Sequence, residues 1–89
     1  MYEWHDVLRL NEEAKRLELL GEWERAAETW IDCYVAFETF EHPGVNISSV
    51  VTAGMEAEDG FRRCVKRVKG SAADALEDKM NLYKNGLSC

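Results

Sequence analysis

Apolar residues recur at three- and four-residue steps along most of this chain, which is the spacing of one face of an α-helix. The first repeat predicts a helix over about residues 3–20 and the second a helix over about residues 22–41. The apolar positions of these two repeats are Val7, Leu10, Ala14, Leu17, Trp23, Ala26, Ala27, Trp30, Cys33 or Tyr34, and Phe37. Gly21 lies between the repeats and favours the left-handed backbone that ends many helices. A connection this short predicts that the two helices pack antiparallel as an αα-hairpin.

The second half of the chain predicts one or two further helices. Pro43-Gly44 breaks the second helix, because proline lacks the backbone donor that a helix needs. The remaining repeats predict helices over about residues 48–69 and 72–85. One seam consistent with the repeat of the first of these helices is Val51, Gly54, Glu58, Phe61, Val65 and Val68, with Met55, Ala57 and Cys64 alongside. The expected seam of the second is Ala72, Ala73, Leu76, Met80 and Tyr83. Asp59-Gly60 interrupts the first of them and leaves its continuity open.

No stretch alternates apolar and polar residues in the two-residue period of a β-strand. The 89 residues are 46% hydrophobic and 31% charged, which is the composition of a single globular domain. We therefore predict an all-α domain over residues 1–89, in which the antiparallel hairpin is extended into a small helical bundle.

Composition also bears on where the protein resides. No apolar run approaches the roughly 18 residues of a membrane-spanning helix, and the first residues lack the apolar centre of a signal peptide. The three cysteines, Cys33, Cys64 and Cys89, are widely spaced and form no C-x-x-C pair. These features predict a cytoplasmic protein with reduced thiols and no membrane contact.

Residues that support catalysis or metal binding are sparse. His5 and His42 stand apart from any serine or cysteine at a recognisable spacing, and the chain has no glycine-rich phosphate loop. The histidines and cysteines show none of the paired spacings of zinc sites. The sequence therefore predicts a protein that is not an enzyme and has no catalytic residues, metal site or cofactor.

The net charge of −6 is distributed unevenly along the chain. Residues 1–42 carry 11 acidic and 4 basic residues, whereas residues 43–89 carry 6 acidic and 7 basic residues. The acidic first half suits a basic protein partner.

One basic cluster lies near the end of the predicted third helix. Its residues are Arg62, Arg63, Lys66 and Arg67. Cations at this end of a helix are favoured by the helix dipole, which explains the cluster without a ligand. An alternative hypothesis is that the cluster contacts DNA phosphates. Direct DNA binding is the weaker hypothesis, because the next predicted helix begins with acidic residues that repel phosphate.

The segment AKRLELLGEWERAAETW, residues 14–30, resembles the hairpin of small regulators carried by enterobacteria and phages, the ANR type (AraC negative regulators) and the PerC type. The shared form is Ala-x-x-Leu-Glu-x-x-Gly-x-aromatic-x-x-Ala-Ala-x-x-Trp. The arginine-rich stretch that ends in cysteine in those families is loosely matched by FRRC, residues 61–64. The matching residues are Ala14, Leu17, Glu18, Gly21, Trp23, Ala26, Ala27, Trp30 and, more loosely, Arg62, Arg63 and Cys64.

The resemblance implies a regulator that binds another protein, typically a basic AraC-type transcription activator, and blocks its dimerisation or DNA binding. PerC-type proteins are activating regulators, so the sign of regulation stays open. An alternative reading is a phage- or plasmid-encoded inhibitor of a host or defence protein, anti-CRISPR-like and acting by acidic DNA mimicry. A helical adaptor or a toxin-neutralising protein is a third reading.

The second predicted helix is the expected binding surface. Trp23 and Trp30 lie about two turns apart on one helical face and are expected in the hairpin core. Aromatic side chains nevertheless dominate interface energies, and surrounding charges steer association. The predicted partner-binding residues are Trp23, Tyr34, Phe37, Glu24 and Glu28. A homodimer is also predicted, because the chain has many large apolar side chains for its size.

Overall fold

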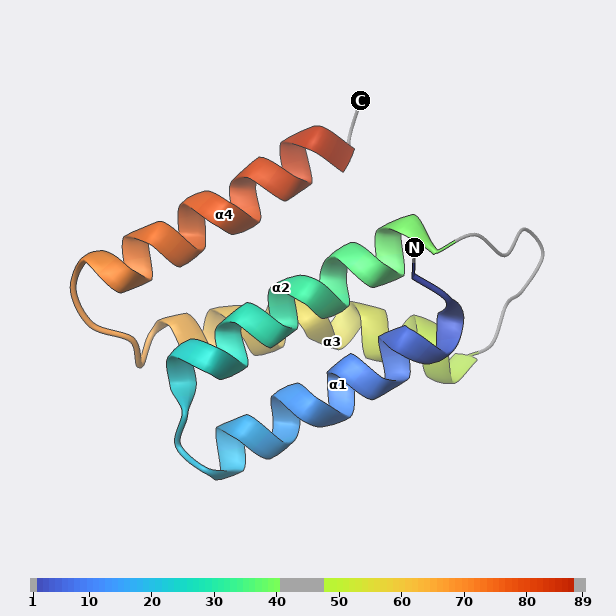
Figure 1. The fold of residues 1–89 in the computed structure, drawn as a ribbon, viewed down its shortest axis with the longest axis horizontal. Coiled ribbons are helices and arrows are strands. Elements are labelled where there is room, and N and C mark those ends of the chain that lie inside the picture. Colours follow the sequence, from blue (N-terminus) through green and yellow to red (C-terminus); the bar gives the residue numbers. More distant parts are fainter. Residues whose placement is uncertain (1, 41–47, 88–89) are drawn as a thin grey trace.

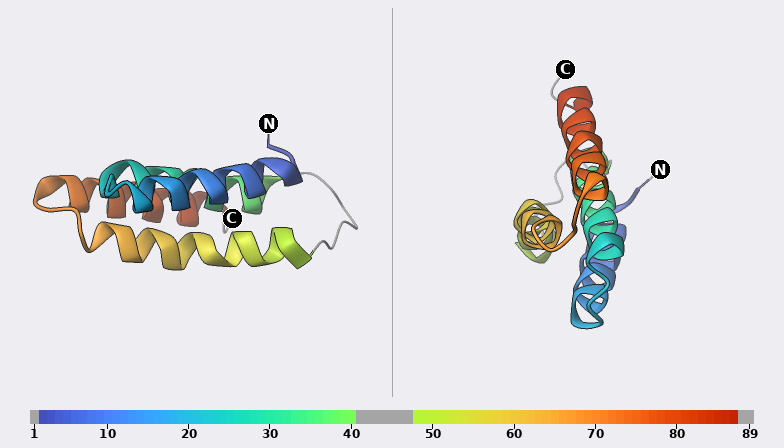
Figure 2. Two further views of the ribbon diagram at one scale, coloured as in Figure 1. Left: turned by 90° about the horizontal axis from the view of Figure 1, so that it is seen from below. Right: turned by 90° about the vertical axis from the view of Figure 1, so that its left-hand side faces the viewer.

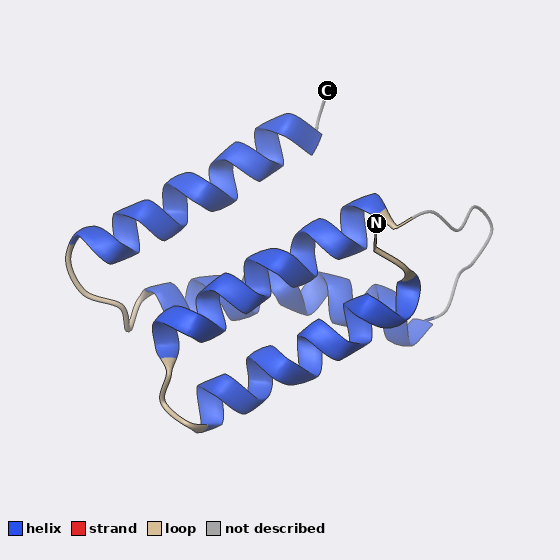
Figure 3. Cartoon of the chain, in the orientation of Figure 1, coloured by secondary structure: helices blue, strands red, loops and turns tan. Residues whose placement is uncertain are grey.

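The computed structural model describes residues 2–40 and 48–87. Within them the protein is all-α, with four helices packed as a small bundle and no strand (Figure 1; Figure 3). The helices are α1 (Trp4–Leu19), α2 (Trp23–Thr39), α3 (Ser48–Val65) and α4 (Ser71–Leu87). The predicted fold class is confirmed. Residues 41–47, which include the predicted break at Pro43-Gly44, lie outside the described part of the chain.

Each helix runs antiparallel to the one before it (Figure 1). Figure 2 shows α1, α2 and α4 in one layer, with α3 on one side of that layer. Helix α3 packs against both helices of the hairpin, whereas α4 packs mainly beside α2 and meets α3 less extensively. The core therefore lies between the α1–α2 hairpin and α3.

The turn between α1 and α2 explains why the hairpin forms at this point. Gly21 has a φ of +76°, a conformation that favours glycine because it has no Cβ. The backbone N–H groups of Gly21 and Glu22 donate to the carbonyls of Glu18 and Leu17, each at 3.0 Å. This pair of bonds is a Schellman motif, which satisfies the last free carbonyls of α1 and confirms the predicted role of Gly21.

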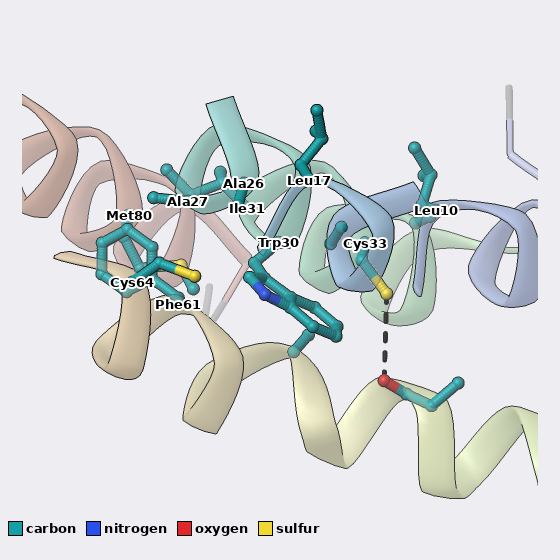
Figure 4. Close-up of a cluster of buried hydrophobic side chains, with 14 of the residues drawn as sticks. Leu10, Leu17, Ala26, Ala27, Trp30, Ile31, Cys33, Phe61, Cys64 and Met80 are labelled. Carbon is teal, nitrogen blue, oxygen red and sulfur yellow. Dashed lines mark hydrogen bonds between the residues drawn. The ribbon is translucent and has the colours of Figure 1, made fainter. Parts of the chain in front are cut away.

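The backbone of α3 approaches α2 closely because small residues line the contact. A Cβ built on Gly60 would overlap the Trp30 indole, and one built on Gly54 would overlap the Phe37 ring. Figure 4 shows Trp30 pointing from α2 towards α3. Helix α3 is continuous through Asp59-Gly60, so the question that the sequence left open is resolved in favour of one helix.

A single carbonyl on α3 ties the first three helices together inside the core. The Ala53 carbonyl accepts a hydrogen bond from Asn11 Nδ2 at 3.3 Å and a longer one from Cys33 Sγ at 3.8 Å, drawn as a dashed line in Figure 4. Asn11 is the buried polar side chain of α1, and this bond compensates the loss of its contact with water. The bonds fix the position of α3 along the hairpin.

Two details of α3 differ from the sequence prediction. Gly54, Ala57, Phe61, Cys64 and Val65 are buried as predicted, but Val51 and Met55 are exposed. The predicted seam is wrong at these two positions, because the helix instead turns Val50 and Ala53 towards the core. The helix also ends at Val65 rather than near residue 69. Beyond it, the Arg67 and Val68 N–H groups donate to the carbonyls three residues back, which tightens the chain into turns.

Candidate partner-binding surface at the turn end of the bundle

The five predicted partner-binding residues do not form one surface. Trp23, Tyr34 and Phe37 are each partly buried against the core, on the side of α2 that faces α3 and α4. The Phe37 ring lies against Gly54, and Lys84 Nζ is 6.0 Å from the centre of the Tyr34 ring. Glu24 and Glu28 are exposed. Most of the aromatic face that the sequence offered to a partner is thus covered by the chain's own helices.

The most exposed large apolar residues near α2 are Leu19 and Leu20, which the sequence analysis did not select. Leu19 is 89% exposed and Leu20 is 61% exposed. The bonds that close α1 are made by backbone groups, so neither leucine side chain is needed for the turn. Both lie off the Val7–Leu10–Ala14–Leu17 face, and that mismatch with the helical period is the sequence signal that could have identified them.

A shallow hollow adjoins Leu19. It has a volume of about 420 Å³ and is lined by Lys15, Glu18, Leu19 and Trp23. Its walls are the partly buried indole of Trp23, the exposed Leu19 side chain and the stems of the two charged residues. A hollow of this kind can accept one large apolar side chain from a partner.

The predicted basic cluster lines a second hollow, of about 510 Å³. Its residues are Asp59, Arg62, Arg63, Lys66 and Arg67. Arg62 is 3.4 Å from Glu58, and Arg63 forms two hydrogen bonds to Glu18, of 2.7 and 2.9 Å. In the described part of the chain, no carboxylate lies within 4.0 Å of the side-chain nitrogens of Lys66 or Arg67. The cluster therefore contains two paired arginines and two cations available to a ligand.

Two contacts between sequence-distant residues join the two hollows. The guanidinium of Arg67 lies over the Trp23 ring, 4.7 Å from its centre, and Arg63 pairs with Glu18 across 45 residues of sequence. Each contact links one residue of the apolar hollow to one of the cationic hollow. We name the joined region the turn-end surface; it consists of Lys15, Glu18, Leu19, Leu20, Trp23, Asp59, Arg62, Arg63, Lys66 and Arg67.

Glu18 connects the turn-end surface to the core. Besides the two bonds from Arg63, its carboxylate accepts a hydrogen bond of 3.0 Å from Nε1 of the buried Trp30. The bonds from Arg63 are the largest cause of a Glu18 pKa below its usual value, and the bond from Trp30 adds to them. A fixed carboxylate with a bidentate arginine partner holds the ends of α1 and α3 together.

We expect Glu18→Gln to lower the free energy of unfolding at neutral pH and to have a smaller effect at about pH 3. The amide still accepts the Trp30 bond but loses the charge that pairs with Arg63. A carboxylate with a depressed folded-state pKa stabilises the fold above its unfolded-state pKa, and this contribution disappears as the pH falls through the folded-state pKa. Urea denaturation of both proteins at several pH values measures the difference. Equal differences at both pH values would contradict the ion-pair role of Glu18.

The two described cysteines belong to the core rather than to a reactive site. Burial raises the pKa of the Cys33 and Cys64 thiols to about 12, so both are neutral at physiological pH.

In residues 2–40 and 48–87, no group of three or more His, Cys, Asp or Glu side chains could hold a metal ion. A third hollow, of about 270 Å³, lies between α3 and α4 beside Glu58, Met80 and Lys84.

None of the described helices is long and apolar enough to cross a membrane. Comparison with known proteins found no matching family model, no matching curated protein and no matching solved structure. The functional interpretation therefore depends on the turn-end surface and on the residues that form it.

Proposed function

We propose that this chain is a small, non-enzymatic regulatory protein that binds another protein through the turn-end surface. The observation that carries the proposal is the exposure of Leu19, which lines the Trp23 hollow, and of Leu20, the next residue in the chain. Exposing neighbouring large apolar side chains to water is unfavourable, and covering them with a partner lowers the free energy of the complex. Aromatic and arginine side chains such as Trp23 and Arg67 are the types that most often dominate binding energy.

A transcription regulator is the partner class that we propose. The support is the resemblance of residues 14–30 to the ANR and PerC types, and this segment includes Leu19, Leu20 and Trp23. In that resemblance Gly21 and Trp23 are matched positions; here Gly21 lies in the turn that follows Leu19 and Leu20, and Trp23 is the first residue of α2. A homodimer stays a prediction of the sequence.

The charges around the basic cluster favour a protein over DNA. Arg62 and Arg63 are paired with carboxylates, and Asp59 lies in the same hollow. Duplex DNA carries one negative charge per about 1.7 Å of its axis, so it would also meet the acidic residues of the hairpin. The whole chain has a net charge of −6, which repels a polyanion.

One feature supports a second candidate, an inhibitor that presents acidic groups to a basic host or defence protein. Glu12, Glu24 and Glu28 are exposed on the hairpin, and no described cation lies within 4.0 Å of their carboxylates. Such a surface imitates the charge of nucleic acid. None of these glutamates lines the two hollows of the turn-end surface, so variants can distinguish the two candidates.

We expect Leu19→Ser combined with Leu20→Ser to weaken partner binding by at least about 30-fold, the effect of losing an interface hot spot of about 2 kcal/mol. Partners captured from the host by the tagged chain would be identified by mass spectrometry, purified, and titrated against each variant by calorimetry. The double variant should remain folded, because both side chains are exposed.

The matched control is Leu82→Ser, which removes a leucine of similar exposure, 72%, from α4. It should bind as the unmodified chain does. The second candidate predicts the reverse pattern, in which Glu24→Gln with Glu28→Gln loses binding and the leucine variant keeps it. That result would overturn the proposal and support the acidic inhibitor.

A further inference from the structure

We infer that the turn-end surface binds an acidic peptide segment of its partner, one that places a large apolar side chain in the Trp23 hollow and carboxylates on Lys66 and Arg67. This inference rests on the proposed function and specifies the chemistry of the partner. It depends on the fact that the apolar and cationic hollows are joined, which allows one short segment to contact both.

The apolar part of the segment is specified by the hollow beside Trp23. Leu19 is nearly fully exposed there, and Trp23 is the other apolar residue that lines it. The charged residues of this hollow, Lys15 and Glu18, are already paired with Glu56 and Arg63. A charged ligand group would gain little binding free energy here, because Lys15 and Glu18 are already neutralised by their partners. A leucine or aromatic side chain would gain binding free energy by leaving water.

The acidic part is specified by the two available cations. Lys66 is exposed, and in the described part of the chain its ammonium has no carboxylate partner. The Arg67 guanidinium rests over the Trp23 ring and, among the described residues, makes no side-chain hydrogen bond. A guanidinium held by an aromatic ring keeps its N–H donors for a carboxylate, and holding it in place reduces the entropy lost on binding. Arg67 borders the apolar hollow through its contact with Trp23, and Lys66 lines the cationic hollow together with Arg67.

The same charges limit the length of an anionic ligand. Beyond Lys66 and Arg67 the surface contains Asp59 and the paired arginines, and the hairpin beside it is acidic. Charges within about 10 Å of one another interact at physiological ionic strength, so a long polyanion would be repelled by that neighbouring surface. A short segment with a few carboxylates is attracted by Lys66 and Arg67 and is too short to reach the acidic residues that would repel it.

The inference is tested by selecting binders from a phage-displayed library of random 12-residue peptides with the complete chain as bait. The Leu19→Ser, Leu20→Ser double variant serves for counter-selection, so that only peptides bound at the turn-end surface are enriched. We expect the enriched peptides to combine aspartate or glutamate with leucine or an aromatic residue. Enrichment of basic peptides, or no enrichment over the counter-selection, would overturn the inference.

The best enriched peptide would then be synthesised and titrated into the ¹⁵N-labelled protein. We expect the indole N–H signal of Trp23 and the amide signals of Leu19 and Lys66 to shift, and the indole signal of buried Trp30 to move less. Lys66→Glu should weaken the peptide roughly fivefold, the effect of losing one exposed ion pair of about 1 kcal/mol. Lys79→Glu, which reverses an exposed lysine on α4, is the matched control and should leave the affinity unchanged.

Two further probes cover other anionic ligands. A 12-base-pair DNA duplex and phosphatidylserine vesicles should leave the Trp23 and Lys66 signals unshifted at physiological salt. Shifts with either probe, in the absence of an acidic peptide that binds, would overturn the inference. If no acidic peptide binds but the leucine double variant still loses the captured partner, the inference fails and the proposed function stands.

Discussion

Trp30→Ala is expected to lower the free energy of unfolding by about 3–5 kcal/mol, the usual loss when a buried tryptophan is truncated. Trp30 is fully buried between the hairpin and α3, and its indole N–H is bonded to Glu18. The substitution would leave a cavity against Gly60 and remove one of the bonds that hold the Glu18 carboxylate. Because small domains have total stabilities of about 5–15 kcal/mol, a loss of this size is a large part of the whole. Urea denaturation followed by circular dichroism measures it.

Trp23→Ala is the matched control for that measurement. It removes the same side chain, but Trp23 is only partly buried and borders solvent at the turn-end surface. We expect a smaller loss of stability and, in addition, weaker partner binding. Equal losses of stability for the two tryptophans would contradict the assignment of Trp30 to the core and Trp23 to the surface.

Gly60→Ala should also destabilise the protein strongly, by about 1–3 kcal/mol or more, although alanine is the better helix former. The new methyl group would overlap the Trp30 indole, which is enclosed on all sides and has little room to move. Either α3 shifts away from α2 or the indole leaves its preferred position, and both reduce packing in the core. The midpoint of urea denaturation reports the change.

Two other glycines provide controls for this prediction. Gly54→Ala should destabilise less, because the Phe37 side chain in its way is only partly buried and can be displaced as a whole, unlike the fully buried Trp30 indole. A Cβ at Gly86, in the last turn of α4, would meet no atom within 4 Å, so Gly86→Ala should be neutral or slightly stabilising. A Gly60→Ala protein as stable as the Gly86→Ala protein would show that α2 and α3 do not pack as closely as described.

The proposed binding surface shows why some of its residues could not be predicted from the sequence. Tyr34 and Phe37 are of the aromatic type that often anchors interfaces, yet they lie on the side of α2 that meets α3 and α4. A helix packed on two sides buries aromatic residues that look available when only the hairpin is considered. The four residues of the basic cluster line one hollow, but the pairing of Arg63 with Glu18 depends on a contact across 45 residues of sequence, which local pattern does not contain.

The sequence by itself determined the helices and the turn between the first two. Helix formation and termination follow from local periodicity and from single residues such as Gly21, whose left-handed backbone needs no distant partner. The same periodicity placed Leu10, Ala14, Leu17 and Trp30 in the core, where they are found. These properties depend on residues within a few turns of one another, so a single sequence contains them.

Only the tertiary structure decided which faces meet. The rotation of α3 about its axis, which exposes Met55 and buries Ala53, is selected by close packing against Trp30 and by the bonds to the Ala53 carbonyl. The placement of Arg67 over Trp23 follows from that rotation and from the tight turns after Val65. Packing of this kind depends on the shapes of several helices at once, and periodicity along one helix contains no information about it.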